Sequence, residues 1–179
     1  MADRVPVLWL FTDARRLGDP LAAVARLPKG LSGVVFRHDG DPRRAELGRA
    51  LARLCRARGL PMVVAGDWRL AVALRAGLHL RGGRKPGHAP PWRGLLTSSA
   101  HDMVELRRAR RAGARLVFLS PAFATASHRE VTPLGPARWG KLARAARITV
   151  AALGGIDGAS VRRLPSRYCA GAGAIGALV

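Results

Sequence analysis

Residues 150–156 read Val150-Ala151-Ala152-Leu153-Gly154-Gly155-Ile156, a short apolar run that leads into two glycines. A related pattern returns at 171–177, Gly171-Ala172-Gly173-Ala174-Ile175-Gly176-Ala177. Short apolar runs of this kind predict buried strands. Glycines at a strand end let the main chain approach an anion with unpaired N–H groups. The two stretches therefore predict a pair of phosphate-binding loops after two successive strands, although Gly154-Gly155 could also be only a tight turn.

The rest of the chain repeats the strand pattern and separates the strands by amphipathic segments. We expect strands at residues 5–12, 33–37, 61–65, 78–80, 94–97, 116–119, 148–153 and 171–178. Helical patterns lie between them, except at Arg81–Pro91, where Gly, Pro and basic residues predict a loop. Strict alternation predicts parallel strands that close into a (β/α)8 TIM barrel, and phosphate loops at the last two strands suit that fold.

The barrel is expected to be compact, to form a single domain over residues 1–179, and to lack its last helix. The sequence ends at Val179, where an eighth helix should begin. Either the sequence is truncated there, or a partner such as a second copy in a homodimer covers the exposed strands. An open doubly wound sheet is the alternative architecture, but no Gly-x-Gly-x-x-Gly follows the first strand.

Charge is the most unusual feature of the composition. The chain carries 31 basic and 11 acidic residues, for a net charge of +20, with 5% aromatic residues. Arginines are spread along every predicted helix, which does not favour specific nucleic-acid recognition and instead predicts a surface that attracts anions. The sequence contains no apolar run of about 18 residues or more, so it does not predict a membrane-spanning helix. Two cysteines do not make a disulfide framework, and we expect a cytoplasmic protein.

Five motifs, taken together in this order, resemble the thiamine phosphate synthase family, which includes the thiazole tautomerase relatives. They are the opening strand Leu8–Asp13, the strand end Val35–Arg37, the pair His79-Leu80, the loop Ser120–Ser127, and the turn Leu153–Ile156. Each motif alone is weak, but their order and spacing carry the likeness over nearly the whole chain.

The resemblance implies a transferase of thiamine biosynthesis that joins hydroxymethylpyrimidine diphosphate to thiazole phosphate, with Mg²⁺ bridging the diphosphate. It implies a cradle for the thiazole phosphate at Gly154, Gly155, Ile175 and Gly176. It also implies that the pyrimidine and the diphosphate face Arg37, Thr97, Ser98, Thr125 and Ser127, of which Arg37, Thr97 and Ser98 are the catalytic candidates. His128 stands where the family has a lysine and is a further candidate anion contact.

Several departures from the family pattern fall on the expected chemistry. Arg37 is followed by His38 and Asp39 instead of an acid and a lysine, and Asp67 is the candidate metal carboxylate after the third strand. Residues 81–85 are Arg-Gly-Gly-Arg-Lys where the family supplies a second metal acid. The histidine of the tautomerase relatives is replaced by Pro121. A barrel that binds thiazole phosphate or thiamine phosphate without turnover therefore stands beside the transferase as an alternative.

Some of these side chains have an ordinary structural interpretation as well. Arg37 either points into the mouth of the barrel or forms a salt bridge with Asp13 or Asp39. His79 lies between two leucines, and we expect it to be a packed core residue.

Overall fold

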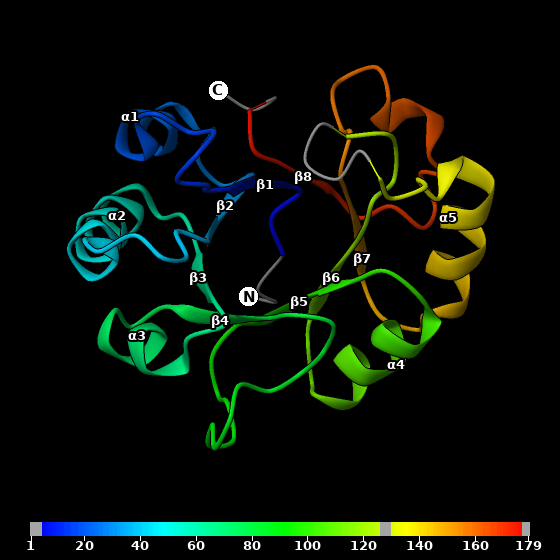
Figure 1. The fold of residues 1–179 in the computed structure, drawn as a ribbon. Coiled ribbons are helices and arrows are strands. Elements are labelled where there is room, and N and C mark those ends of the chain that lie inside the picture. The colour runs from blue at the N-terminus through cyan, green and yellow to red at the C-terminus, as the bar shows by residue number, and fades with distance from the viewer. Residues whose placement is uncertain (1–4, 126–129, 177–179) are drawn as a thin grey trace.

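The computed structural model of the chain describes residues 5–125 and 130–176. Eight parallel strands close into a barrel in the order of the chain, and β1 completes the ring by pairing with β8 (Figure 1). The strands are β1 Leu8–Phe11, β2 Ser32–Phe36, β3 Met62–Ala65, β4 Gly77–Leu80, β5 Leu96–Ala100, β6 Leu116–Leu119, β7 Val150–Leu153 and β8 Ala172–Ala174. The (β/α)8 prediction is confirmed.

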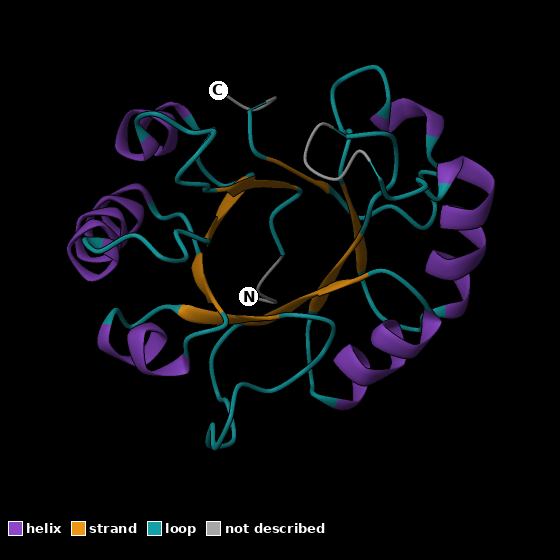
Figure 2. Cartoon of the chain, in the orientation of Figure 1, coloured by secondary structure: helices purple, strands orange, loops and turns teal. Residues whose placement is uncertain are grey.

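Helices cover the outside of the ring (Figure 2). They are α1 Pro20–Arg26, α2 Arg44–Arg58, α3 Trp68–Ala73, α4 Met103–Arg111, α5 Gly135–Ala145 and the short 3₁₀ helix η1 Val161–Arg163. The segment between β4 and β5 contains no helix, as its composition predicted. No helix in the described part of the chain is long and apolar enough to cross a membrane.

Aspartates begin three of these helices. The carboxylates of Asp19, Asp67 and Asp102 accept backbone N–H groups of the first turns of α1, α3 and α4. This arrangement satisfies amides that have no partner inside the helix. Helix α2 has no such aspartate cap: it begins at Arg44, and the nearby Asp41 carboxylate accepts the amide of Arg43 at 2.8 Å.

Aromatic rings fill the inside of the barrel. Trp9 and Phe11 of β1 make edge-to-face contacts with Phe118 of β6, with ring centroids 5.6 and 4.8 Å apart. Glycines on the neighbouring strands make room for them, because a Cβ at Gly33 would lie 2.7 Å from the Trp9 ring and one at Gly173 would lie 2.7 Å from the Phe11 ring. The interior is therefore packed at the level of these rings, and Phe11 also lines a cavity at the carboxyl ends of the strands.

Candidate functional site

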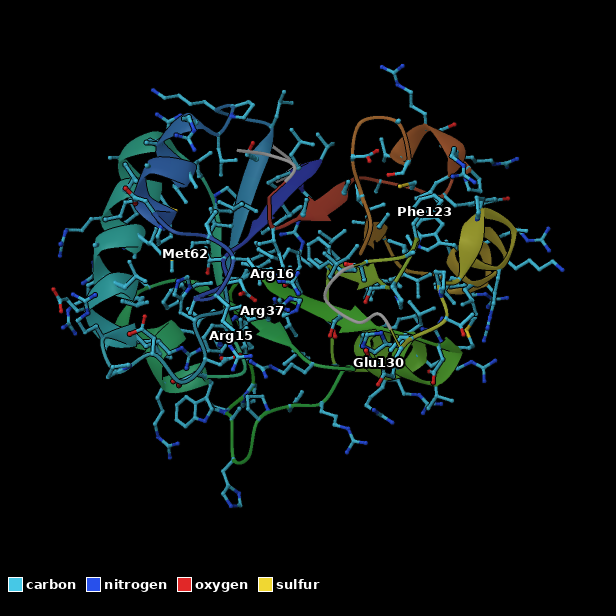
Figure 3. The ribbon with its side chains drawn as sticks, turned by 45° about the horizontal axis from the view of Figure 1, so that its top comes forward. Arg15, Arg16, Arg37, Met62, Phe123 and Glu130 are labelled. Atoms are coloured by element: carbon cyan, nitrogen blue, oxygen red, sulfur yellow. The ribbon has the colours of Figure 1, made fainter. Side chains whose placement is uncertain are left out.

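A cavity of about 890 Å³ opens at the carboxyl ends of the strands. Its wall includes residues that directly follow β2, β4, β6, β7 and β8, namely Arg37, Arg81, Ser120, Gly154 and Ile175. Arg16 joins this wall from the loop after β1, and Figure 3 shows Arg16 and Arg37 near one another at the middle of the molecule. Since catalytic and binding groups of TIM barrels gather at this end, the cavity is the candidate functional site.

Two glycine turns lie side by side in the cavity wall. Gly154 and Gly155 follow β7 with left-handed φ angles of 86° and 64°, and Ile175 and Gly176 follow the neighbouring β8. Among the described residues, the backbone amides of these four have no protein acceptor. Both turns therefore have the donors that the predicted phosphate cradle requires.

The loop after β6 presses against the first of these turns. The amide of Phe123 donates to the carbonyl of Gly154 at 3.0 Å, and that of Ala122 donates to Leu153 at 2.8 Å. A Cβ at Gly155 would lie 2.4 Å from the carbonyl oxygen of Ala124, so a glycine is needed there for packing as well as for its φ angle. Thr125 of this loop lines the cavity, whereas Ser127 and His128 lie outside the described residues.

His79 forms part of the cavity floor. It is 3% exposed, its Nδ1 lies 2.8 Å from Thr97 Oγ1, and its ring meets Phe11 edge to face. The expectation of a packed histidine is confirmed, but the ring also lines the cavity. Burial, and after it the charges of Arg81 and Arg37, lower the pKa of His79 to about 3. The imidazole is therefore neutral near pH 7.

Thr97 and Ser98 do not line the cavity, which corrects their expected position. Thr97 is fully buried beside His79, while Ser98 Oγ accepts the amide of Gly83 at 2.9 Å. Adjacent residues of a strand point to opposite faces, so Ser98 is directed away from the barrel interior that Thr97 faces. Ser99, two residues above Thr97 on β5, lines the cavity instead.

Arg37 satisfies both of its expected interpretations. Its guanidinium lines the cavity, and its Nη2 lies 2.7 Å from Asp13 Oδ2. Burial alone would raise the pKa of Asp13, but hydrogen bonds from the Arg15 amide and the Arg37 guanidinium hold it below its ordinary value. Asp13 thus stays charged and fixes the Arg37 side chain at the rim.

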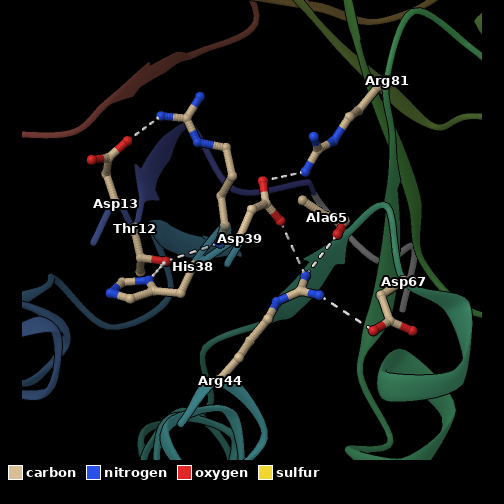
Figure 4. Close-up of polar contacts among 9 residues, drawn as sticks. Thr12, Asp13, His38, Asp39, Arg44, Ala65, Asp67 and Arg81 are labelled. Atoms are coloured by element: carbon tan, nitrogen blue, oxygen red, sulfur yellow. Dashed lines mark hydrogen bonds and ion pairs between the residues drawn. The ribbon is translucent and has the colours of Figure 1, made fainter. Parts of the chain in front are cut away.

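A network of ion pairs occupies the rim between β2, β3 and β4 (Figure 4). Arg44 at the start of α2 lies 3.5 Å from Asp39 and 3.3 Å from Asp67, and it also donates to the carbonyl of Ala65 at 2.9 Å. Asp39 is paired in addition with Arg81. The second carboxylate oxygen of Asp67 accepts the amide of Leu70 at 2.9 Å.

These residues do not fit the magnesium site that the resemblance implies. Magnesium takes hard oxygen ligands and usually one or two carboxylates. Here the Asp67 carboxylate is shared between a helix N-terminus and Arg44, and Asp67 is not part of the cavity wall. Nowhere in residues 5–125 and 130–176 do three or more His, Cys, Asp or Glu side chains form a group suited to a metal ion.

The fold and the site define a TIM-barrel protein with a cavity lined by arginines and glycine turns at the carboxyl ends of its strands. The chain belongs to the thiamine monophosphate synthase family, whose sequence model matches residues 8–178. The resemblance indicated by the five motifs is confirmed.

Individual relatives agree with this assignment. The chain is 32% identical over 149 residues to thiamine-phosphate synthase of Synechococcus sp. (strain WH7803), covering 78% of this chain and 42% of the relative. It is 33% identical over 140 residues to thiamine-phosphate synthase of Geobacillus kaustophilus, covering 74% and 62%. The chain thus spans less than two thirds of the length of these two relatives.

A solved structure shows the same fold. Thiamine phosphate pyrophosphorylase from Pyrococcus furiosus superposes with a TM-score of 0.76 at 24% sequence identity, over 94% of this chain and 85% of that one.

Proposed function

We propose that the chain is a transferase of the thiamine-phosphate synthase type, which joins hydroxymethylpyrimidine diphosphate to thiazole phosphate and releases pyrophosphate. One observation carries the proposal: the two glycine turns and Arg37 face the same cavity at the carboxyl rim. Membership in the family supports it, and the relatives named above bear the same activity in their names. The cavity volume lies within the range of small-molecule sites.

The two sides of the cavity offer different chemistry. The amides of Gly154, Gly155, Ile175 and Gly176 suit the single phosphate of the thiazole. The arginines after β2 and β4 suit the diphosphate. A phosphorylated ligand on each side would bring the two rings together above the neutral His79.

The reaction breaks the bond between the pyrimidine methylene carbon and a diphosphate oxygen, and the electron pair leaves with pyrophosphate. The ring nitrogen of the thiazole then donates its electron pair to the methylene carbon and forms the new C–N bond. Negative charge grows on the leaving group as the bond breaks, so guanidinium groups fixed beside it stabilise the transition state. Arg37, held by Asp13, is such a group. Binding both substrates in one cavity also accelerates the reaction, because it orients the reacting atoms toward each other.

The test of the transferase uses both substrates, with thiamine phosphate and pyrophosphate detected by mass spectrometry. Gly176→Val should remove turnover, because a side chain there meets no atom of the described residues within 4 Å and would occupy the cavity space proposed for the phosphate. Gly158→Val is the matched control, since a Cβ at that position is likewise clear of the part of the chain that the structure describes, but Gly158 does not line the cavity. Equal turnover in the two variants would contradict the proposal.

The misfit with magnesium favours a second candidate, a barrel that binds thiazole phosphate or thiamine phosphate without turnover. Such a protein would be stabilised by the ligand in a concentration-dependent way. A rise in melting temperature with thiamine phosphate, in the absence of product from the two substrates, would select this candidate over the transferase.

A further inference from the structure

The turn after β4 presents two arginines at the rim of the cavity on a rigid frame. Arg81 and Arg84 face each other across an antiparallel bridge, and the amide of Arg84 donates to the Arg81 carbonyl at 3.0 Å. Gly82 and Gly83 between them have positive φ angles of 55° and 70°. Both arginine side chains line the cavity.

Neighbouring elements hold this turn in place from below. Ser98 Oγ accepts the amide of Gly83 at 2.9 Å, and Arg108 of α4 donates to the carbonyl of Gly82 at 2.9 Å. A Cβ at Gly83 would lie 2.4 Å from the amide of Ala109, so the turn packs directly on α4. The buried Ser98 thus positions the turn and does not itself face the cavity.

The charges at this rim are exchanged relative to the pattern that the resemblance implies. Asp39 follows β2 where a lysine is implied, and an arginine turn follows β4 where an acid is implied. The two changes compensate, because Asp39 and Arg81 form an ion pair. Asp39 and Asp67 are both drawn to Arg44, which leaves their carboxylates poorly placed for a cation.

We propose that this cavity binds the diphosphate of its ligand directly through the arginines, without a divalent cation. The proposal rests on the proposed function, in that it concerns the diphosphate side of the same site. Five arginines line the cavity, namely Arg16, Arg37, Arg81, Arg84 and Arg138, and Glu105 is the carboxylate of the wall. Guanidinium groups bind phosphate oxygens through two parallel hydrogen bonds, so they can neutralise a diphosphate that would otherwise need a metal.

The test is calorimetric titration of the full chain with inorganic pyrophosphate, once with EDTA and once with excess Mg²⁺. Metal-free binding predicts that affinity in EDTA equals or exceeds that with Mg²⁺, because Mg²⁺ competes with the arginines for free pyrophosphate. Arg84→Gln should weaken binding about tenfold, as expected for the loss of one charge-assisted contact. Arg111→Gln on the outside of α4 is the control and should change the affinity less than about twofold.

Affinity that rises tenfold or more with Mg²⁺, or an Arg84→Gln variant that binds as tightly as the Arg111→Gln control, would overturn the proposal. The outcome is separable from that of the transferase assay. Metal-free binding of pyrophosphate without product formation would support metal-free diphosphate binding and refute turnover. Product formed only with Mg²⁺ would support turnover and refute metal-free diphosphate binding.

Discussion

Replacing His79 by asparagine should remove a large part of the acid sensitivity of this protein. The imidazole is buried at the cavity floor, and its pKa is lowered to about 3 by burial first and by the nearby Arg81 and Arg37 second. In the unfolded chain the same side chain titrates near pH 6.5. Between these two values the unfolded state binds a proton that the folded state does not, so stability falls as the pH falls below about 6.5.

The size of the effect follows from the two pKa values. At pH 5 the unfolded chain is favoured by up to about 2 kcal/mol relative to pH 8, since each pH unit below 6.5 contributes about 1.4 kcal/mol. The asparagine of the His79→Asn variant would be neutral at every pH, and its amide can still reach Thr97. The lowered pKa values of His38, Asp13 and Asp157 act in the same direction, but they are common to both proteins and cancel in the comparison.

The measurement is urea unfolding of the wild type and of His79→Asn at pH 8 and pH 5. The loss between the two pH values should be smaller in the variant by up to about 2 kcal/mol, a measurable share of typical domain stability. His88→Asn in the exposed loop before β5 is the matched control and should behave like the wild type. Parallel losses in the wild type and in His79→Asn would show that the folded protein accepts the proton at His79, which contradicts the lowered pKa of this side chain.

Three other changes test the packing that supports the site. Gly155→Ala should lower the free energy of unfolding by about 2–5 kcal/mol, because the alanine would have a left-handed conformation and its Cβ would clash with the Ala124 carbonyl. Gly176→Ala is the control and should change the urea midpoint little. Similar midpoints in the two variants would contradict the prediction. Asp67→Ala should lower stability by about 1–2 kcal/mol by removing the α3 cap, and an unchanged melting temperature would refute it. Burial raises the pKa of Cys55 to about 11, so its thiol should react with a disulfide reagent at pH 8 only after urea is added. Fast labelling of Cys55 in the native protein would contradict this prediction.

The order of strands and helices was predictable from the sequence because a parallel barrel buries every strand. Continuous apolar runs such as Leu116–Leu119 and Val150–Leu153 are separated by helices with clear ends, including Gly59 in a left-handed conformation after α2. Strand β5 does not have a continuous apolar run; it was expected at residues 94–97 and is found at Leu96–Ala100. Its polar Thr-Ser-Ser core does not have the pattern of a buried strand, because its upper part faces a cavity and a neighbouring turn.

That shift also explains why the site was only partly predictable. The register that pairs Leu78 with Leu96 decides which serine of β5 reaches the cavity, and pairing between strands cannot be derived from one strand alone. Asp67 has the carboxylate of a metal ligand, but an aspartate directly before a helix is also a typical helix cap. Its ion-pair partner Arg44 lies 23 residues away in the chain, so the sequence did not indicate this contact. The glycine turns were predictable because their conformation is local.

The rim of the cavity is charged, whereas its floor is uncharged. Its rim carries arginines whose charge is partly balanced by Asp13 and Asp39, while its floor is made of Phe11, Ala65 and the neutral His79. An anion at the rim would cancel part of the field that Arg81 and Arg37 exert on His79, but burial, the larger cause of its low pKa, would remain. The floor therefore stays uncharged whether or not the rim is occupied. A ligand with anionic ends and neutral rings fits this division, because each part meets a surface that does not need to change its charge to receive it.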